Sequence, residues 1–162
     1  VRSAKIINIV SASLMLVAGI LLMTINSMEE IIAQRIMLGI LFGLTGGAKI
    51  FGFFSNDLYR LAFQHDFAVG IFCELLALLI VLSPAQNYDV MYLLLVVYVL
   101  FDALLKVQMS LDARRFGMQS WGLILGTALG LGVVGAFAAA ALQAELVRAL
   151  FLVGFALTLD GM

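Results

Sequence analysis

Six long apolar segments separated by short polar turns make up almost all of this chain. They cover residues 5–26, 31–54, 61–83, 89–110, 119–141 and 145–161. A helix needs about 20 apolar residues to cross the hydrocarbon core of a bilayer. Inside a membrane, backbone polar groups must also be paired within the protein, which favours helices. The pattern therefore predicts an all-α integral membrane protein with six transmembrane helices in one domain, residues 1–162.

Composition supports lipid as the main surrounding of the chain. Hydrophobic residues make up 64% of the sequence, charged residues 12%, and the mean hydropathy is +1.16. An ordinary soluble domain has about 25% charged residues. The net charge of −1 offers no basic surface for nucleic acid, so we expect no nucleic-acid partner.

The nine Lys and Arg residues are sorted by the six segments, and their distribution predicts the orientation. Arg35 and Arg148 fall on one side, and the other seven fall on the opposite side: Arg2, Lys5, Lys49, Arg60, Lys106, Arg114 and Arg115. Basic residues concentrate in cytoplasmic loops. We therefore expect a multi-pass membrane protein with both termini in the cytoplasm. The first apolar run is long for a signal peptide and is interpreted as a retained helix.

Weak internal similarity indicates three tandem helical hairpins. Arg35 and Thr45 align with Arg148 and Thr158 without a gap, and Gly19, Glu74 and Gly132 come into register in the odd-numbered segments. The hairpins would cover about 5–54, 61–110 and 119–161, and each would begin and end on the cytoplasmic side. The copies are then parallel, unlike the inverted repeats of many transporters.

Two glycine stripes predict close helix packing. Glycines recur every four residues in the second and fifth segments, so each set lies on one helix face: Gly39, Gly43 and Gly47, then Gly122, Gly126 and Gly130. Small residues at this spacing let two membrane helices approach closely. We expect both helices to be central, with a homo-oligomer interface as the alternative role for one stripe. The fourth segment has no glycine and is expected to face lipid more.

Glu74 is the sharpest candidate for a functional site, because it lies halfway along the third segment. Charged groups inside a bilayer are costly and mark functional sites by default. Glu74 is either a protonatable group that senses or moves protons or holds a ligand, or a packing residue hydrogen-bonded to a neighbouring helix. The sequence leaves both interpretations open.

The other polar residues indicate structural roles. Asp102 and Lys106 are four residues apart, in the favourable order for an ion pair on one helix face. Lys49 and Asp160 lie at similar depths near the cytoplasmic ends of their segments, where long side chains reach the interface. Cys73 is expected to be a small buried hydrophobe, and His65 is the only histidine, so no metal site or cofactor is predicted. No nucleophile and base occur at a catalytic spacing, and we expect no enzyme.

Short motifs resemble the HdeD family of bacterial acid-resistance membrane proteins, which are built from hairpin repeats. The resemblance lies in Gln119-Ser120-Trp121-Gly122 at the start of the fifth segment and Leu159-Asp160-Gly161 at the end of the sixth. Glu74 departs from the pattern, since the family has a small residue there. The resemblance implies a six-helix inner-membrane protein connected with acid stress, and it supplies no catalytic residues.

Three functions remain open from the sequence. The first is a non-enzymatic HdeD-like protein in tolerance of acid or envelope stress, with lipid as its surroundings. The second is an accessory subunit that docks onto a larger membrane complex through a glycine stripe or the fourth helix. The third is a small proton or solute channel, whose polar lining would come from five residues: Glu74, Thr45, Thr127, Ser11 and Ser13.

Overall fold

The computed structural model describes the whole chain except residues 1, 25–27, 55–63, 84–87, 142–145 and 162. Six α-helices and no strands occur in these described residues. The helices are α1 (Arg2–Met23), α2 (Met28–Phe54), α3 (Gln64–Leu82), α4 (Tyr88–Arg115), α5 (Trp121–Ala141) and α6 (Leu146–Asp160). The all-α class predicted from the sequence is confirmed.

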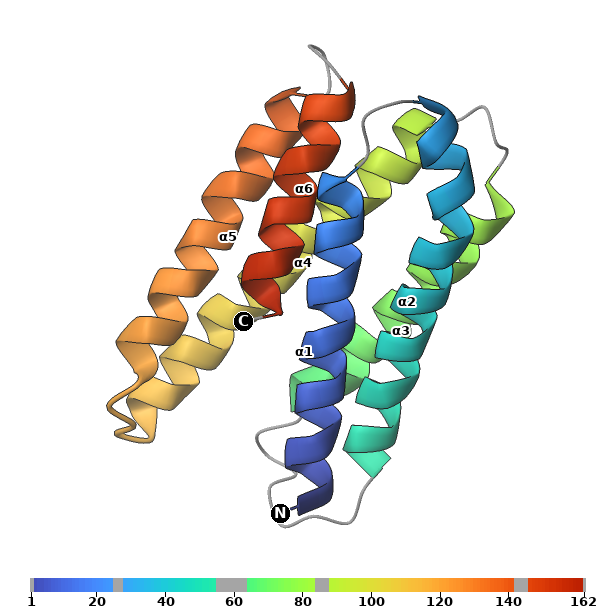
Figure 1. Ribbon diagram of the computed structural model, residues 1–162. Helices are drawn as coiled ribbons and strands as arrows, with labels where there is room; N and C mark the ends of the chain where they lie inside the picture. The colour runs from blue at the N-terminus through green and yellow to red at the C-terminus, as the bar shows by residue number, and fades with distance from the viewer. Residues whose placement is uncertain (1, 25–27, 55–63, 84–87, 142–145, 162) are drawn as a thin grey trace.

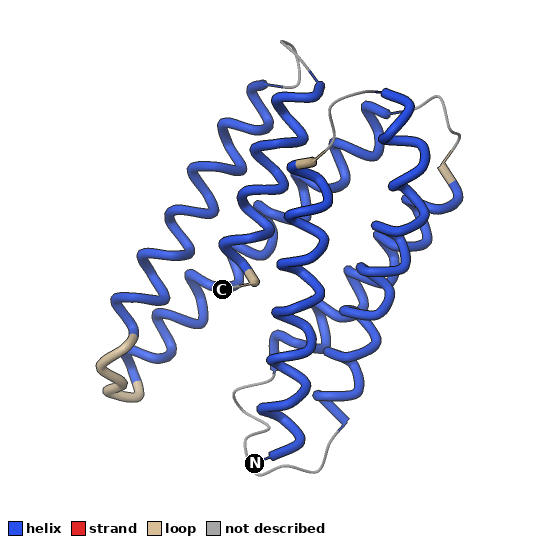
Figure 2. The backbone as a smooth tube through the Cα atoms, in the orientation of Figure 1, coloured by secondary structure: helices blue, strands red, loops and turns tan. Residues whose placement is uncertain are grey.

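The helices form an antiparallel ring in which each one packs against the next, and α6 closes the ring on α1 (Figure 1). The most extensive contacts join α2 to α3, α4 to α5, and α1 to α6. Figure 2 shows the same path as a backbone tube. α2 ends and α3 begins at the end of the ring at which α1 begins (Figure 1), so Lys49 and Asp66 lie toward that end, whereas Asp160 lies beside the middle of α1, where Gly161 meets Ala12 and Leu16. We call the end at which α1 begins the charged end.

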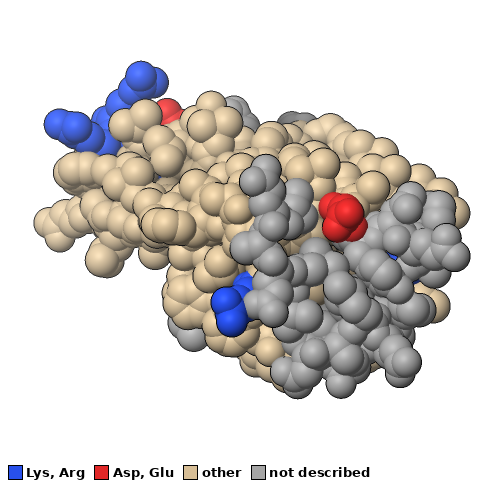
Figure 3. Space-filling view, turned by 90° about the horizontal axis from the view of Figure 1, so that it is seen from above, with Lys and Arg blue, Asp and Glu red and all other residues tan. Residues whose placement is uncertain are grey.

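The outer surface suits a lipid environment. Four helices among the described residues, α1, α2, α4 and α5, are long and apolar enough to cross a membrane. Large apolar side chains cover the outside, for example Leu123 at 78% and Phe51 at 77% exposure. The view from above shows few charged groups among the described residues (Figure 3). Exposed apolar surface on this scale is unusual for a protein in water, so the chain is compatible with a membrane protein.

α4 is the most buried of the four candidate spans, which reverses the expectation that it faces lipid. Half of its span Asp89–Arg115 is buried, whereas only 22% of the α5 span is. α4 runs behind α1 and α6 and meets α3, α5 and α6 (Figure 1). Tyr92 and Tyr98 are fully buried along it, and the Tyr92 hydroxyl donates to the Ala138 carbonyl of α5. Aromatic side chains can bury a large area where no glycine is present. The absence of glycine from α4 was therefore a poor reason to expect that it faces lipid.

The α2 glycine stripe lies against α3, as a close-packing role requires. A Cβ added at Gly46 would come within 2.8 Å of the Gly70 carbonyl oxygen, and one at Gly39 within 2.5 Å of a Val81 methyl. Gly43 leaves more room, since the nearest atom to its added Cβ is 3.7 Å away, on Ala77. Direct backbone contact at Gly46 and Gly70 explains why these two helices pack so extensively.

The α5 stripe behaves in the opposite way. Within 4 Å of a Cβ added at Gly122, Gly126 or Gly130 there is no described atom, and all three residues are exposed. α5 contacts its neighbours through another face, which carries Leu131 and Gly135. The expected central position of α5 is therefore wrong within one copy of the chain, because four-residue spacing defines a face but not the direction in which it points.

The turn between α4 and α5 is fixed by one glycine. Gly117 has a φ of 72°, a left-handed conformation that is costly for residues with a Cβ. Its N–H donates to the Arg114 carbonyl and the Met118 N–H to the Ala113 carbonyl, both at 3.0 Å. These two bonds form a Schellman motif, which ends α4. The Arg114 guanidinium then lies 5.0 Å from the centre of the Trp121 ring.

A charged cavity between five helices as the candidate functional site

A cavity of about 330 Å³ lies between α1, α2, α3, α4 and α6. Its charged lining comes from four of these helices. The side chains are Lys49 of α2, Asp66 of α3, Asp102 and Lys106 of α4, and Asp160 of α6. Charged groups in the interior of a membrane protein face the bundle or a cavity, and they mark functional pathways and sites. This cavity is therefore the candidate site.

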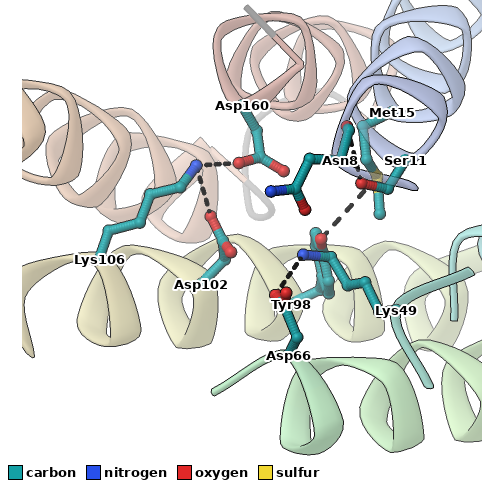
Figure 4. Close-up of polar contacts among 9 residues, drawn as sticks. All are labelled: Asn8, Ser11, Met15, Lys49, Asp66, Tyr98, Asp102, Lys106 and Asp160. Atoms are coloured by element: carbon teal, nitrogen blue, oxygen red, sulfur yellow. Dashed lines mark hydrogen bonds and ion pairs between the residues drawn. The ribbon is translucent and has the colours of Figure 1, made fainter. Parts of the chain in front are cut away.

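Lys106 joins two aspartates from different helices (Figure 4). Its ammonium lies 3.0 Å from Asp102 Oδ2, one helical turn away on α4, and it donates a hydrogen bond to Asp160 Oδ1 on α6. Asp102 is 8% exposed. Two carboxylates around one ammonium hold the C-terminal end of α6 against α4, and one negative charge of the trio stays unbalanced.

A second ion pair crosses from α2 to α3. Lys49 Nζ donates to Asp66 Oδ1 at 3.1 Å, and each side chain is 19% exposed. Asp66 lies in the first turn of α3, where the helix dipole favours an acidic residue. The two lysines and three aspartates together leave one carboxylate in excess of the ammonium groups.

α1 supplies neutral polar groups to the same cavity. The Ser11 hydroxyl donates to the Asn8 carbonyl at 3.0 Å. The Asn8 side chain extends between Asp160 and the Lys49–Asp66 pair (Figure 4). Its amide forms no hydrogen bond with the rest of the described chain. A donor and an acceptor are therefore available beside the charges.

Beyond Met15, toward the opposite end, the bundle is apolar. The Tyr98 hydroxyl lies 3.8 Å from the Met15 sulfur, and the edge of Phe42 packs on the Tyr98 ring with centroids 5.1 Å apart. The next buried layers are made mainly of aliphatic side chains, among them Leu22, Leu38, Leu76, Ile80, Leu95 and Leu150. The charged lining of the cavity thus adjoins a mainly apolar part of the bundle.

Glu74 lies outside this cavity. It is exposed on the α3 surface, and its carboxylate meets the α2 glycine stripe, with Oε1 3.5 Å from a Cβ added at Gly47. No described residue forms a hydrogen bond or ion pair with it. The alternative that Glu74 is hydrogen-bonded to a neighbouring helix of the same chain therefore finds no bonding partner among the described residues.

The five residues considered for a channel lining do not converge. Ser11 lines the cavity, while Glu74 is exposed on another face. Ser13 and Thr127 are exposed, and Thr45 is buried, but all three hydroxyls donate to carbonyls of their own helices. Cys73 is fully buried, as expected of a small hydrophobe. The side chain of His65 lies outside the described residues.

Sequence reasoning singled out Glu74 and underrated Asp66 and Asp160. The signal available in the sequence was the position of the charged residues along their segments. Four of them lie toward the side that is expected to be cytoplasmic: Lys49, Asp66, Lys106 and Asp160. Position along a segment does not show which helices are neighbours, and the closure of α6 on α1 and α4 brings these side chains together. Among the described residues, no group of three potential metal ligands from His, Cys, Asp and Glu occurs.

Comparison with known proteins found no matching family model, no similar curated protein and no matching solved structure.

Proposed function

We propose that the chain is a six-pass protein of a bacterial plasma membrane, with the charged end in the cytoplasm. Lys49, Lys106, Arg114 and Arg115 lie toward this end, as the positive-inside rule requires of the cytoplasmic side. Arg35 lies toward the other end, where its Nη1 donates to the Ser83 carbonyl at 2.6 Å. Reporter fusions at Arg114 and Arg148 are expected to report opposite compartments, and a shared compartment would contradict this topology.

Three tandem hairpins account for the ring. Gly19, Glu74 and Gly132, which align in the sequence, each meet the preceding even-numbered helix. Gly19 packs on α6 at Gly154, Glu74 on α2 at Gly46, and Gly132 on α4 at Ala103. The same contact between neighbouring hairpins therefore occurs three times around the ring, which supports the repeat boundaries 5–54, 61–110 and 119–161.

The proposed activity is non-enzymatic: tolerance of acid or envelope stress through the charged cavity. One observation carries the proposal, namely five charged side chains around a cavity that also has apolar walls. Such a site takes up protons or charged solutes. The link with stress comes from the HdeD-like motifs at Trp121 and Asp160.

Survival of bacteria at low pH tests this function. Cells that express the wild-type chain are expected to survive better than cells with an empty vector. The double variant Asp102→Asn with Asp160→Asn is expected to lose the protection, because it removes the carboxylates around Lys106. Glu74→Gln and Asp112→Asn, both outside the cavity, serve as matched variants at equal membrane abundance. Equal survival with and without the wild-type chain would remove the stress role.

The open face of α5 favours a second function, an accessory subunit in a larger membrane assembly. Gly122, Gly126 and Gly130 are exposed and meet no described atom within 4 Å, so a helix from another subunit or a second copy could approach closely. Gly126→Leu is expected to release that partner in native electrophoresis of mild-detergent extracts. An unchanged migration would argue against this function.

A further inference from the structure

We propose that the charged cavity binds a small organic cation whose primary ammonium group lies against Asp102 and Asp160. This inference goes beyond the proposed function and does not require a role in stress. It depends on the volume of the cavity, its unbalanced charge and the chemistry of its walls.

The charge of the lining selects a monocation. Three aspartates face two lysines, and each lysine already contacts at least one aspartate. An anion would have to displace a carboxylate from an ammonium group. A cation meets the surplus carboxylate directly, in surroundings where poor solvation strengthens the attraction.

Asp102 supplies the unsatisfied acceptor. Its Oδ2 is buried and forms an ion pair with the Lys106 ammonium 3.0 Å away, but it accepts no hydrogen bond from any described residue. A donor on an occupant of the cavity would complete the hydrogen bonding of this carboxylate. An ammonium has three donors, which Asp102, Asp160 and the Asn8 amide oxygen can accept.

The walls beside these acceptors are suited to an alkyl chain. Met15, Val69, Leu105 and Met109 line the cavity together with the charged groups. A volume of about 330 Å³ falls at the lower end of the range for ligand pockets. A metal ion fits less well, because the three carboxylates do not form a metal-binding group in the described chain. The combination of a carboxylate end and an apolar side therefore indicates an alkylammonium.

Lys106 acts in this arrangement as a tethered occupant of the same carboxylates. Its ammonium must share Asp102 and Asp160 with any ammonium that enters. Removal of the Lys106 ammonium therefore strengthens the binding of a free alkylammonium. If Lys106 formed only a structural ion pair, its removal would not increase the affinity for an alkylammonium.

Calorimetric titration of n-butylammonium into the full chain in detergent at neutral pH tests the proposal. The wild type is expected to bind n-butylammonium, but neither butyrate nor butan-1-ol, whose alkyl parts are similar. Asp102→Asn and Asp160→Asn are each expected to weaken binding about tenfold, the equivalent of one charge-assisted hydrogen bond. Lys106→Met is expected to strengthen binding about tenfold for the same reason.

Asp112→Asn is the matched control, because Asp112 is on the same helix and pairs with exposed Arg115 outside the cavity. It is expected to bind as the wild type does. If Lys106→Met is less stable, n-butylammonium raises its melting temperature more than that of the wild type. Equal affinity of the wild type, Asp102→Asn and Lys106→Met, or equal binding of butan-1-ol, would overturn the proposal.

Discussion

The α2 and α5 glycine stripes have the same spacing but opposite surroundings. At Gly39 of the α2 stripe an added Cβ comes within 2.5 Å of a Val81 methyl of α3, whereas at Gly126 of the α5 stripe it meets no described atom within 4 Å. One stripe stabilises the fold of a single chain, and the other leaves a face free. Spacing alone therefore identifies a face that permits close approach, and the neighbouring helix decides whether the approach occurs.

The largest effect is expected for Gly46→Ala. The new methyl group collides with the Gly70 carbonyl and the Glu74 backbone nitrogen, neither of which can rotate away as a side chain can. Overpacking of this kind destabilises by about 1–3 kcal/mol. Unfolding in mixed detergent and SDS micelles, followed by circular dichroism, measures the loss. Gly43→Ala is the control on the same helix and is expected to cost much less, because its added Cβ comes no nearer than 3.7 Å to Ala77. Equal losses would disprove the close contact at Gly46.

A smaller loss is expected for Gly117→Ala, in the turn that leads into α5. The left-handed φ of 72° costs a residue with a Cβ about 1 kcal/mol. The same unfolding assay measures this loss. A stability equal to that of the wild type would show that the Schellman turn is absent in detergent.

At Gly126, replacement by alanine is expected to change the free energy of unfolding in the opposite direction. Gly126→Ala has room for its methyl group and reduces the freedom of the unfolded chain, so it stabilises by about 0.5 kcal/mol. Gly122→Ala provides a second measurement on the same face. A loss as large as that of Gly46→Ala would mean that a partner helix covers the α5 stripe in the detergent-solubilised protein.

The smallest effect is expected for Glu74→Gln. The side chain is exposed and has no described bonding partner, so its replacement changes the free energy of unfolding by less than about 0.5 kcal/mol. Gly46→Ala, directly beneath it, provides the contrast. A large loss for Glu74→Gln would assign Glu74 a structural bond across the α2–α3 contact.

Much of the fold follows from the sequence because the bilayer restricts the choices. The apolar segments predict the helices, whose bounds differ from the expected ones by several residues, as at Arg115 in α4 against 110. Which helices pack against one another does not follow so directly from the sequence. α4 is buried through Tyr92 and Tyr98, and no glycine marks this on the chain.

The candidate site shows the same limit. Spacing within one helix can place Lys106 beside Asp102, but Asp160 lies 54 residues from Lys106. Its approach depends on how α6 packs on α1 and α4. Glu74 drew attention because it lies halfway along an apolar segment, but this position does not show that the side chain lies on the outside of the bundle.

Closure of the ring by α6 has a consequence for biogenesis. The ribosome delivers α1 first and α6 last, yet these two helices touch through backbone at Gly19 and Gly154, where an added Cβ would come within 2.7 Å of the opposite carbonyl. The first helix therefore has no α6 to pack against until translation is nearly complete. Until then Asp160 has not been delivered to Lys106, and the nascent cavity is left without the carboxylate that α6 contributes.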